Sequence, residues 1–256
     1  MDGTTDNRPE SPTTTNLQRP PDGGWTDSAA AWIEVIDRGE TNRELLLDAV
    51  MLEQGGDVRG LRTLDLGCGE GRFSRMLAER GARTFAIDPI EQLIITAAQR
   101  HAGGAYVRAS GERLPFAAGS FHLVVSYLSL IDIPDFRGAI AESVRVLRPG
   151  GALLVVNLNF VTASEGWARD EAGNRLYHRV DRYAEERPIV LEIGDIHIVN
   201  WHRPLDAYMS AFLGAGLILR SFLEPVPKDG SLRDDPRFED WYRVPLFNVM
   251  RWEKQG

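Results

Sequence analysis

The sequence predicts a doubly wound α/β domain built on a mostly parallel, seven-stranded sheet. Apolar runs of five to seven residues alternate with amphipathic helices along the chain, and runs of this kind are typical of strands buried on both faces. A glycine-rich turn follows the first such run, as expected where a strand end, a helix start and a bound ligand meet. The 256 residues, 43% of them hydrophobic, suffice for one large globular domain.

The amino-terminal part is expected to lie outside the sheet. Residues 1–24 are rich in Thr, Pro, Asp and Asn and are predicted to be a disordered tail, not a signal peptide. Residues 25–57 are predicted to form helices, because Trp25 and Trp32 recur at helical spacing and a second apolar pattern runs from 43 to 52. These helices either close over a ligand as a lid or simply pack an apolar face, and the pattern does not separate the two.

Residues 58–256 form the predicted main domain, which contains the sheet. Its strands are expected at 62–66, 83–88, 105–109, 121–126, 152–158, 217–223 and 245–252, with helices after the glycines and at 91–100, 136–147 and 205–213. The last two strands are expected to pair antiparallel across a short loop. Residues 160–204 break the alternation and are predicted to be a substrate-binding insertion, a lid or a pocket wall.

Composition excludes several classes of function. The net charge of −8, without a cluster of Lys and Arg, argues against nucleic acid as the main partner. No stretch approaches the ~20 apolar residues that a membrane helix needs. The single cysteine, Cys68, cannot form an intrachain disulfide and suits a reducing cytoplasm, and it is expected to fit a tight turn and not to react.

The glycine loop is the main functional signal, and it reads LDLGCGEGRFSR from position 64. A dinucleotide loop has its third glycine five positions after the first, where this chain has Arg72, so an NAD-linked oxidoreductase is disfavoured. Asp65 would suit a ligand ammonium group, and Asp88 at the next strand end would accept hydrogen bonds from ribose hydroxyls. The two acids together would be complementary to a nucleoside joined to an amino acid. Their alternatives are a helix cap for Asp65 and a turn residue for Asp88.

The loop and three later stretches, AIDP, ASGERLPFAAGSFHLVVSYLSLIDIPD and VLRPGGALLVVN, resemble the successive motifs of class I S-adenosylmethionine-dependent methyltransferases. The match runs from about Leu61 to Asn157. The segments NWHRPLDAYMSAFLGAGL and FLEPVP are similar to the substrate side of small-molecule methyltransferases, including those of natural-product and antibiotic biosynthesis. The resemblance implies S-adenosylmethionine as cofactor, S-adenosylhomocysteine as product and a Rossmann-like sheet.

The resemblance also implies roles for single residues. It assigns the methionine part of the cofactor to Asp65, Gly67 and Gly69, and the ribose to Asp88. The adenine would lie among Pro89, Ser110, Gly111 and Glu112, although the family's usual Asp-Ala-Glu is replaced by Ser-Gly-Glu here. Ser126 and Tyr127 would face the sulfonium and the reacting methyl group. Another departure is His122, which stands where the family has an aspartate and lies within a strand.

The acceptor is predicted to be a small organic molecule methylated at an oxygen or a nitrogen. A hydroxyl acceptor needs a base, and among His178, His197 and His202 in the insertion we favour His202 as base or orienting residue. Tyr127 is the second candidate, as an orienting hydroxyl or as a ring against the methyl group, with core packing as its alternative. Arg43 either pairs with the methionine carboxylate or is a solvated surface residue. No metal site is predicted, a homo-oligomer is compatible with the sequence, and a non-catalytic S-adenosylmethionine-binding protein remains an alternative.

Overall fold

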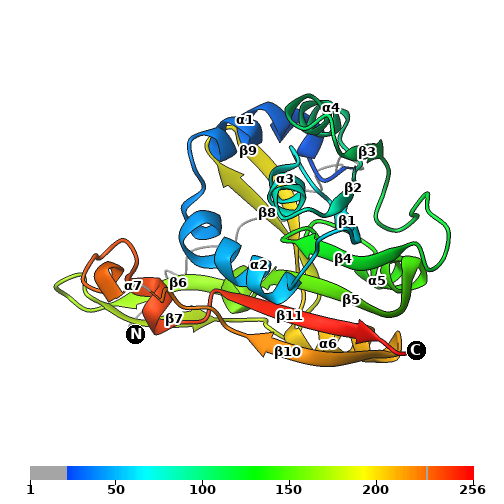
Figure 1. Cartoon of the computed structure of the whole chain (residues 1–256). Coiled ribbons are helices and arrows are strands. Elements are labelled where there is room, and N and C mark those ends of the chain that lie inside the picture. Colours follow the sequence, from blue (N-terminus) through cyan, green and yellow to red (C-terminus); the bar gives the residue numbers. More distant parts are fainter. Residues whose placement is uncertain (1–21, 229) are drawn as a thin grey trace, which may run out of the picture.

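The fold is a seven-stranded sheet with helices on both faces, and the computed structural model describes residues 22–228 and 230–256 (Figure 1). The strand order is β10-β11-β5-β4-β1-β2-β3. The bounds are β1 (Arg62–Leu66), β2 (Arg83–Asp88), β3 (Ala105–Arg108), β4 (Phe121–Tyr127), β5 (Leu147–Leu158), β10 (Leu217–Leu223) and β11 (Phe247–Lys254). All neighbouring pairs are parallel except those that β11 makes with β5 and β10. The predicted fold class is confirmed.

The two faces of the sheet bury different apolar sets because side chains alternate along each strand. On β5, Leu153 and Val155 pack with helices α5 (Phe136–Val146) and α6 (Leu205–Gly214). Leu154 and Val156 point to the other face. That face is covered by α2 (Asp48–Gly55) and α3 (Arg72–Glu79), and α4 (Glu91–Arg100) completes the helices between the parallel strands.

The connection between the last two strands is not the short loop that the sequence predicts. Residues 224–246 include a 3-10 turn, η3 (Gly230–Leu232), and a short helix, α7 (Glu239–Arg243). Phe238 and Trp241 of this segment are buried in the same apolar cluster as Tyr127 and Phe247, so the connection forms part of the core. The difference arises because its aromatic residues are separated by charged ones and form no continuous apolar run.

The insertion folds as two antiparallel hairpins after a short 3-10 turn, η2 (Phe160–Ala163). The first hairpin consists of β6 (Ser164–Arg169) and β7 (Arg175–Val180), the second of β8 (Arg187–Ile193) and β9 (Ile196–His202). Figure 1 shows β6, β7 and α7 together beyond the end of β5, whereas β9 lies beside α1 (Trp25–Asp37). The insertion therefore supplies two walls at the edge where β4 and β5 end.

Hydrogen bonds at the start of helix α1 hold it to the rest of the domain. Asp22 accepts hydrogen bonds from the backbone of Gly24 (3.1 Å) and Thr26 (2.9 Å), and the Gly23 carbonyl accepts one from Val199 of β9 (2.8 Å). Residues 22–24 of the expected disordered tail thus form an anchored turn, and residues 1–21 lie outside the described residues. Within the described ranges, none of the helices has the length and apolar character needed to cross a bilayer.

Candidate active site

The glycine loop bends sharply over the end of β2. The backbone N–H groups of Gly67 and Cys68 both donate to the Ile87 carbonyl at 2.9 Å. Gly67, Gly69 and Gly71 have positive φ values of 69°, 57° and 83°, which favour glycine. A methyl group at Gly67 would lie 2.5 Å from the Ser129 Cβ, so the loop also packs directly on the segment after β4. The ends of β1, β2 and β4 therefore meet at this loop.

Asp88 lies where the sequence predicts it, buried at the end of β2. Its carboxylate accepts hydrogen bonds from the backbone N–H groups of Gly69 (2.9 Å) and Ile90 (3.0 Å), one on each oxygen. Each carboxylate oxygen retains a second lone pair for a ligand hydroxyl. Burial raises the pKa of Asp88 to about 6. The arrangement is suited to holding a pair of hydroxyl groups.

Asp65 is buried on β1, and one of its carboxylate oxygens already accepts a hydrogen bond from the following helix. The Ser74 hydroxyl of α3 donates to its Oδ2 at 2.7 Å, which is close to the capping role that the sequence leaves open. Burial raises the pKa of Asp65 to about 6, and the nearby charge of Asp88 adds to the shift. Asp65 therefore contributes negative charge behind the loop, and its direct contact with a ligand stays a prediction.

Asp132, in the connection after β4, is a site residue that the sequence reasoning missed. Its carboxylate accepts hydrogen bonds from the side chains of Trp25 on α1 and Asn200 on β9. Burial raises the pKa of Asp132 to about 7, and Asp88 raises it further while Arg43 opposes the shift. An acid shortly after an apolar strand was the signal that identified Asp88, and the same signal is present in LSLIDIPD.

Arg43 begins a π-helical turn, η1 (Arg43–Leu47), beside these acids. Its guanidinium carbon lies 4.9 Å from the ring centroid of Tyr127 and 5.3 Å from that of Trp32. Its Nε is buried and has no hydrogen-bond partner among the described residues; the Glu40 carboxylate lies 3.5 Å away. An arginine with 14% of its side chain exposed is not the solvated surface residue of the alternative. It is suited to bind a ligand carboxylate.

Helix α1 covers the glycine loop. A methyl group built on Gly69 would lie 3.6 Å from the Trp32 Nε1. Trp25 and Trp32 meet edge to face at 5.5 Å, and with Ile33 they pack on Ile90 and Leu93. The helix therefore has both features that the sequence offers as alternatives, an apolar packing face and a position over the loop.

Ser126 and Tyr127 are not brought together at the site, because adjacent strand residues face opposite sides of the sheet. The Ser126 hydroxyl is fully buried and pairs with that of Ser129 at 2.7 Å. The Tyr127 hydroxyl donates to the Asp48 carboxylate at 2.8 Å, and burial together with this acid raises the pKa of the phenol. The contact of Ser126 with the sulfonium is thus not supported, and only the ring of Tyr127 borders the site, through Arg43.

His202 is fully buried, and both of its ring nitrogens are occupied. Its Nε2–H donates to the Tyr183 carbonyl and its Nδ1 accepts from the Thr162 hydroxyl, each at 2.7 Å. Burial lowers the pKa of His202. The ring therefore ties β9 to η2 and to the segment between the hairpins, and it has no free nitrogen with which to act as a base. His197 is exposed on the outer side of β9.

The predicted adenine segment lies beside Asp88, since the Ala109 N–H donates to the Asp88 carbonyl at 3.2 Å. Ser110 hydrogen bonds to the Glu112 carboxylate, and Gly111 is buried where a methyl group would come within 2.9 Å of Ile133. Pro89 is exposed at the same edge. These positions agree with a flat ligand group near the end of β3, and the contacts themselves stay predictions.

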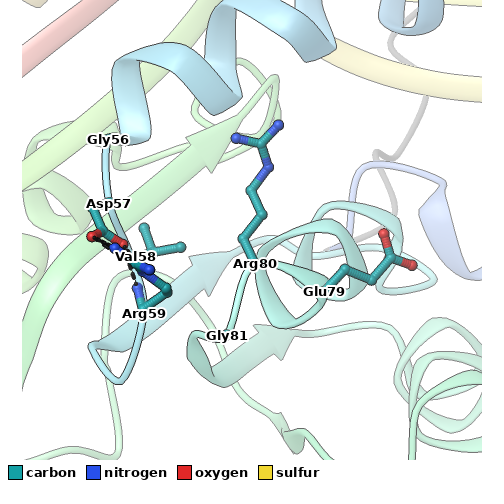
Figure 2. Close-up of a pocket in the computed structure, with 7 residues that line it drawn as sticks. All are labelled: Gly56, Asp57, Val58, Arg59, Glu79, Arg80 and Gly81. Carbon is teal, nitrogen blue, oxygen red and sulfur yellow. Dashed lines mark hydrogen bonds and ion pairs between the residues drawn. The ribbon is translucent and has the colours of Figure 1, made fainter.

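Other chemistry-bearing features do not join the site. Burial raises the pKa of the Cys68 thiol, which disfavours the nucleophilic thiolate form. Within residues 22–228 and 230–256 no group of three or more His, Cys, Asp or Glu residues could hold a metal ion. A surface pocket is lined by residues 56–59 and 79–81 (Figure 2). These residues precede β1 and β2, so the pocket lies at the amino-terminal ends of these strands, opposite to the glycine loop. In the pocket Asp57 pairs with Arg59.

Comparison with known proteins agrees with this geometry. Residues 64–155 match the family model described as "Methyltransferase domain". The malonyl-[acyl-carrier protein] O-methyltransferase of Serratia marcescens is 37% identical over 108 residues, which are 42% of each chain, so the similarity spans less than half of that relative. An S-adenosylmethionine dependent methyltransferase from Mesorhizobium loti has a TM-score of 0.72 at 26% identity, over 85% of this chain and 99% of that one.

A second solved structure extends the likeness. A candidate S-adenosylmethionine dependent methyltransferase from Listeria monocytogenes has a TM-score of 0.73 at 26% identity, over 81% of this chain and 96% of that one. The matched family segment contains β2, β3, β4 and most of β1 and β5, with the glycine loop, Asp88 and Asp132. The family match over residues 64–155 and the likeness to these two solved structures thus support a class I S-adenosylmethionine-dependent methyltransferase.

Proposed function

We propose that this protein transfers the methyl group of S-adenosylmethionine to an oxygen or nitrogen of a small organic molecule. The observation that carries the proposal is the charge around the glycine loop. Three recessed carboxylates, Asp65, Asp88 and Asp132, lie there, and the charge of Arg43 acts on two of them, Asp65 and Asp132. The family's cofactor has a sulfonium and an ammonium group but only one carboxylate, and this surplus of acids complements it.

The residues present fit the cofactor as follows. Asp88 would hold the ribose hydroxyls, Arg43 the methionine carboxylate, and the segment 110–112 with Pro89 would border the adenine. Asp65 and Asp132 would supply negative charge toward the positive groups. Bound S-adenosylmethionine supplies a methyl group already activated on a positively charged sulfur, so the chain's own task is to position the acceptor and exclude water.

Water exclusion would fall to α1 and the second hairpin. Trp25 and Asn200, which come from these two elements, both hydrogen bond to Asp132. The Ser28 hydroxyl exchanges hydrogen bonds with the backbone of His197, accepting one at 2.9 Å. We infer that this assembly covers the reacting groups, with the aromatic insertion as the acceptor wall. A role in natural-product or antibiotic biosynthesis, in the cytoplasm, is part of the same proposal.

Two experiments test the proposal. Calorimetry with S-adenosylmethionine, S-adenosylhomocysteine and NAD is expected to show binding of the first two only, because Arg72 fills the position of the dinucleotide glycine and pairs with Asp48. Transfer of labelled methyl groups to a panel of small phenols, carboxylic acids and amines is expected to identify an acceptor. Binding of NAD alone would refute the cofactor, and cofactor binding without any transfer would favour a non-catalytic binding protein.

Binding of S-adenosylmethionine is expected to weaken as the pH falls through the range 7 to 6. The pKa values of Asp132, about 7, and of Asp65 and Asp88, about 6, lie far above the ordinary carboxyl value of 3.8. A positively charged ligand favours the ionised forms, so protons are released on binding and affinity should drop by about tenfold per pH unit for each proton released. Calorimetry between pH 5 and 8 measures this.

S-adenosylhomocysteine is the control ligand, because it lacks the sulfonium charge and should show a smaller pH dependence. The ligand-free fold should respond in the opposite sense. Carboxyl groups with raised pKa values bind more protons when folded, so their contribution makes the fold less stable as the pH rises from about 4 to 7. Equal pH dependence for the two ligands would contradict the charge argument.

A further inference from the structure

The first hairpin of the insertion is connected to the candidate active site through helix α7. Phe160, in the turn after β5, meets the His178 ring with the two ring centroids 5.2 Å apart. Helix α7 covers the hairpin, with the Arg243 guanidinium 4.3 Å from the centroid of Trp167. The same helix reaches the site, because the indole N–H of Trp241 donates to Asn42 at 3.1 Å, immediately before Arg43. Figure 1 shows this group of elements where β5 ends.

His178 has one occupied and one unused ring nitrogen. The Ser164 hydroxyl oxygen accepts a hydrogen bond from the Gly166 N–H at 3.0 Å, which leaves its own hydrogen to donate to the His178 Nδ1 at 2.8 Å. We therefore assign the ring hydrogen to Nε2. This Nε2 is buried and has no partner among the described residues. Burial lowers the pKa of His178, which keeps the ring neutral and the assignment intact near pH 7.

Trp167 presents the same situation on the neighbouring strand. It lies directly opposite His178 in the hairpin register, and the two ring centroids are 4.1 Å apart. Its indole Nε1–H is also buried and has no partner in the described part of the chain. Buried donors are nearly always paired, because an unpaired one loses its hydrogen bond to water without replacement. Two such donors on contacting rings point to a missing hydrogen-bond acceptor.

Two arginines near the rings are paired with acids. Arg175 pairs with Asp240 at 2.5 Å, and Arg243 pairs with Glu239 at 2.5 Å. The hairpin therefore offers hydrogen-bond donors in an aromatic setting, and the two arginines whose charges act on His178 are paired with acids. An oxygen that accepts hydrogen bonds suits such a place whether it belongs to a neutral carbonyl or to a carboxylate, whereas a cation, which can only donate, does not.

We propose that Trp167 Nε1 and His178 Nε2 form a subsite that binds a carbonyl or carboxylate oxygen of the methyl acceptor. The inference rests on the proposed function for the identity of the ligand, but not for the existence of the subsite. In this subsite His178 binds the acceptor, whereas the sequence alone favoured His202 as a base. The acceptor then carries a carbonyl-type oxygen in addition to the atom that is methylated.

Nuclear magnetic resonance of the full chain, labelled with 15N, tests the subsite with three small probes of similar size: acetamide, acetate and ethylammonium. The Trp167 indole signal is assigned from its loss in Trp167→Phe. Acetamide and acetate are expected to shift this signal in a saturable manner and to leave the Trp201 indole unchanged, whereas ethylammonium should shift neither. His178→Phe should weaken the response about three- to tenfold, the loss of one hydrogen bond.

Tyr177→Phe is the matched control, because Tyr177 lies next to His178 on the exposed side of β7 with 62% of its surface accessible. It should leave the response unchanged, and His178→Leu, which also lacks a side-chain donor, replaces His178→Phe if the latter does not fold. The proposal is overturned if the neutral and anionic probes leave the Trp167 signal unmoved, if ethylammonium shifts it equally, or if the His178 variants respond like the parent chain. Calorimetry with S-adenosylmethionine reports separately on the proposed function, so either can fail alone.

Discussion

Asp88→Ala is expected to weaken S-adenosylmethionine binding by about 100-fold. The carboxylate holds the Gly69 and Ile90 N–H groups at 2.9 and 3.0 Å and has lone pairs left for the ligand. A hydrogen bond to a charged group contributes about 1.5–3 kcal/mol, and the substitution removes both the ligand contacts and the support of the loop. Calorimetry on the variant and the parent chain measures the difference.

Glu91→Gln is the matched control for this prediction. Glu91 is three residues away, but it is exposed, and among the described residues its ion pair is with Arg108, at 3.1 Å on the surface. Its removal should leave the affinity unchanged. Asp88→Asn should lie between the two, since an amide keeps the size of the side chain and one acceptor oxygen but loses the charge. An unchanged affinity in Asp88→Ala would remove the basis of the cofactor assignment at this strand end.

Asp48→Ala is expected to cost about 3 kcal/mol of unfolding free energy, the largest stability effect that we predict. The Asp48 carboxylate accepts hydrogen bonds from both terminal nitrogens of Arg72 and from the Tyr127 hydroxyl, and so joins α2, α3 and the end of β4. Removing it leaves a partly buried guanidinium and a buried phenol without partners. For a chain of this size the melting temperature should fall by roughly 10 °C. Thermal and denaturant unfolding measure both quantities.

Asp57→Ala provides the comparison, because Asp57 also pairs with an arginine, Arg59 at 2.7 Å, but on the surface. Exposed ion pairs contribute little to stability, so the melting temperature of Asp57→Ala should stay near that of the parent chain. Tyr127→Phe should lower the free energy of unfolding by less than Asp48→Ala, since it removes one hydroxyl and leaves the Arg72–Asp48 pair in place. If Asp48→Ala were no less stable than Asp57→Ala, the buried network would not be what holds these elements together.

Local patterns in the sequence were enough to predict most of the sheet and one half of the candidate site. Strand positions follow from apolar runs that each element needs for its own burial, and the glycine loop and Asp88 follow from the rule that parallel strands end at one edge. The alternation of side chains along β4 was also readable, and it would have separated Ser126 from Tyr127 in advance. The connection carrying α7 was missed because Phe238 and Trp241 are buried by distant residues and not by a local pattern.

The roles of the polar side chains were decided by contacts between distant segments. His202 and His178 are both histidines in aromatic surroundings, but Thr162 and Tyr183 occupy both nitrogens of the first, whereas Ser164 occupies only one of the second. Asp132 became a site residue only when α1 and β9 came to lie beside it.

By itself, then, the sequence determined the fold class, the order of the strands along the chain and the acid at the end of β2, because each depends on neighbouring residues. The tertiary structure alone decided which acids share one arginine and which ring nitrogens are left unpaired. Those properties depend on what fills the space around a side chain, and that space is enclosed by residues distant in the sequence.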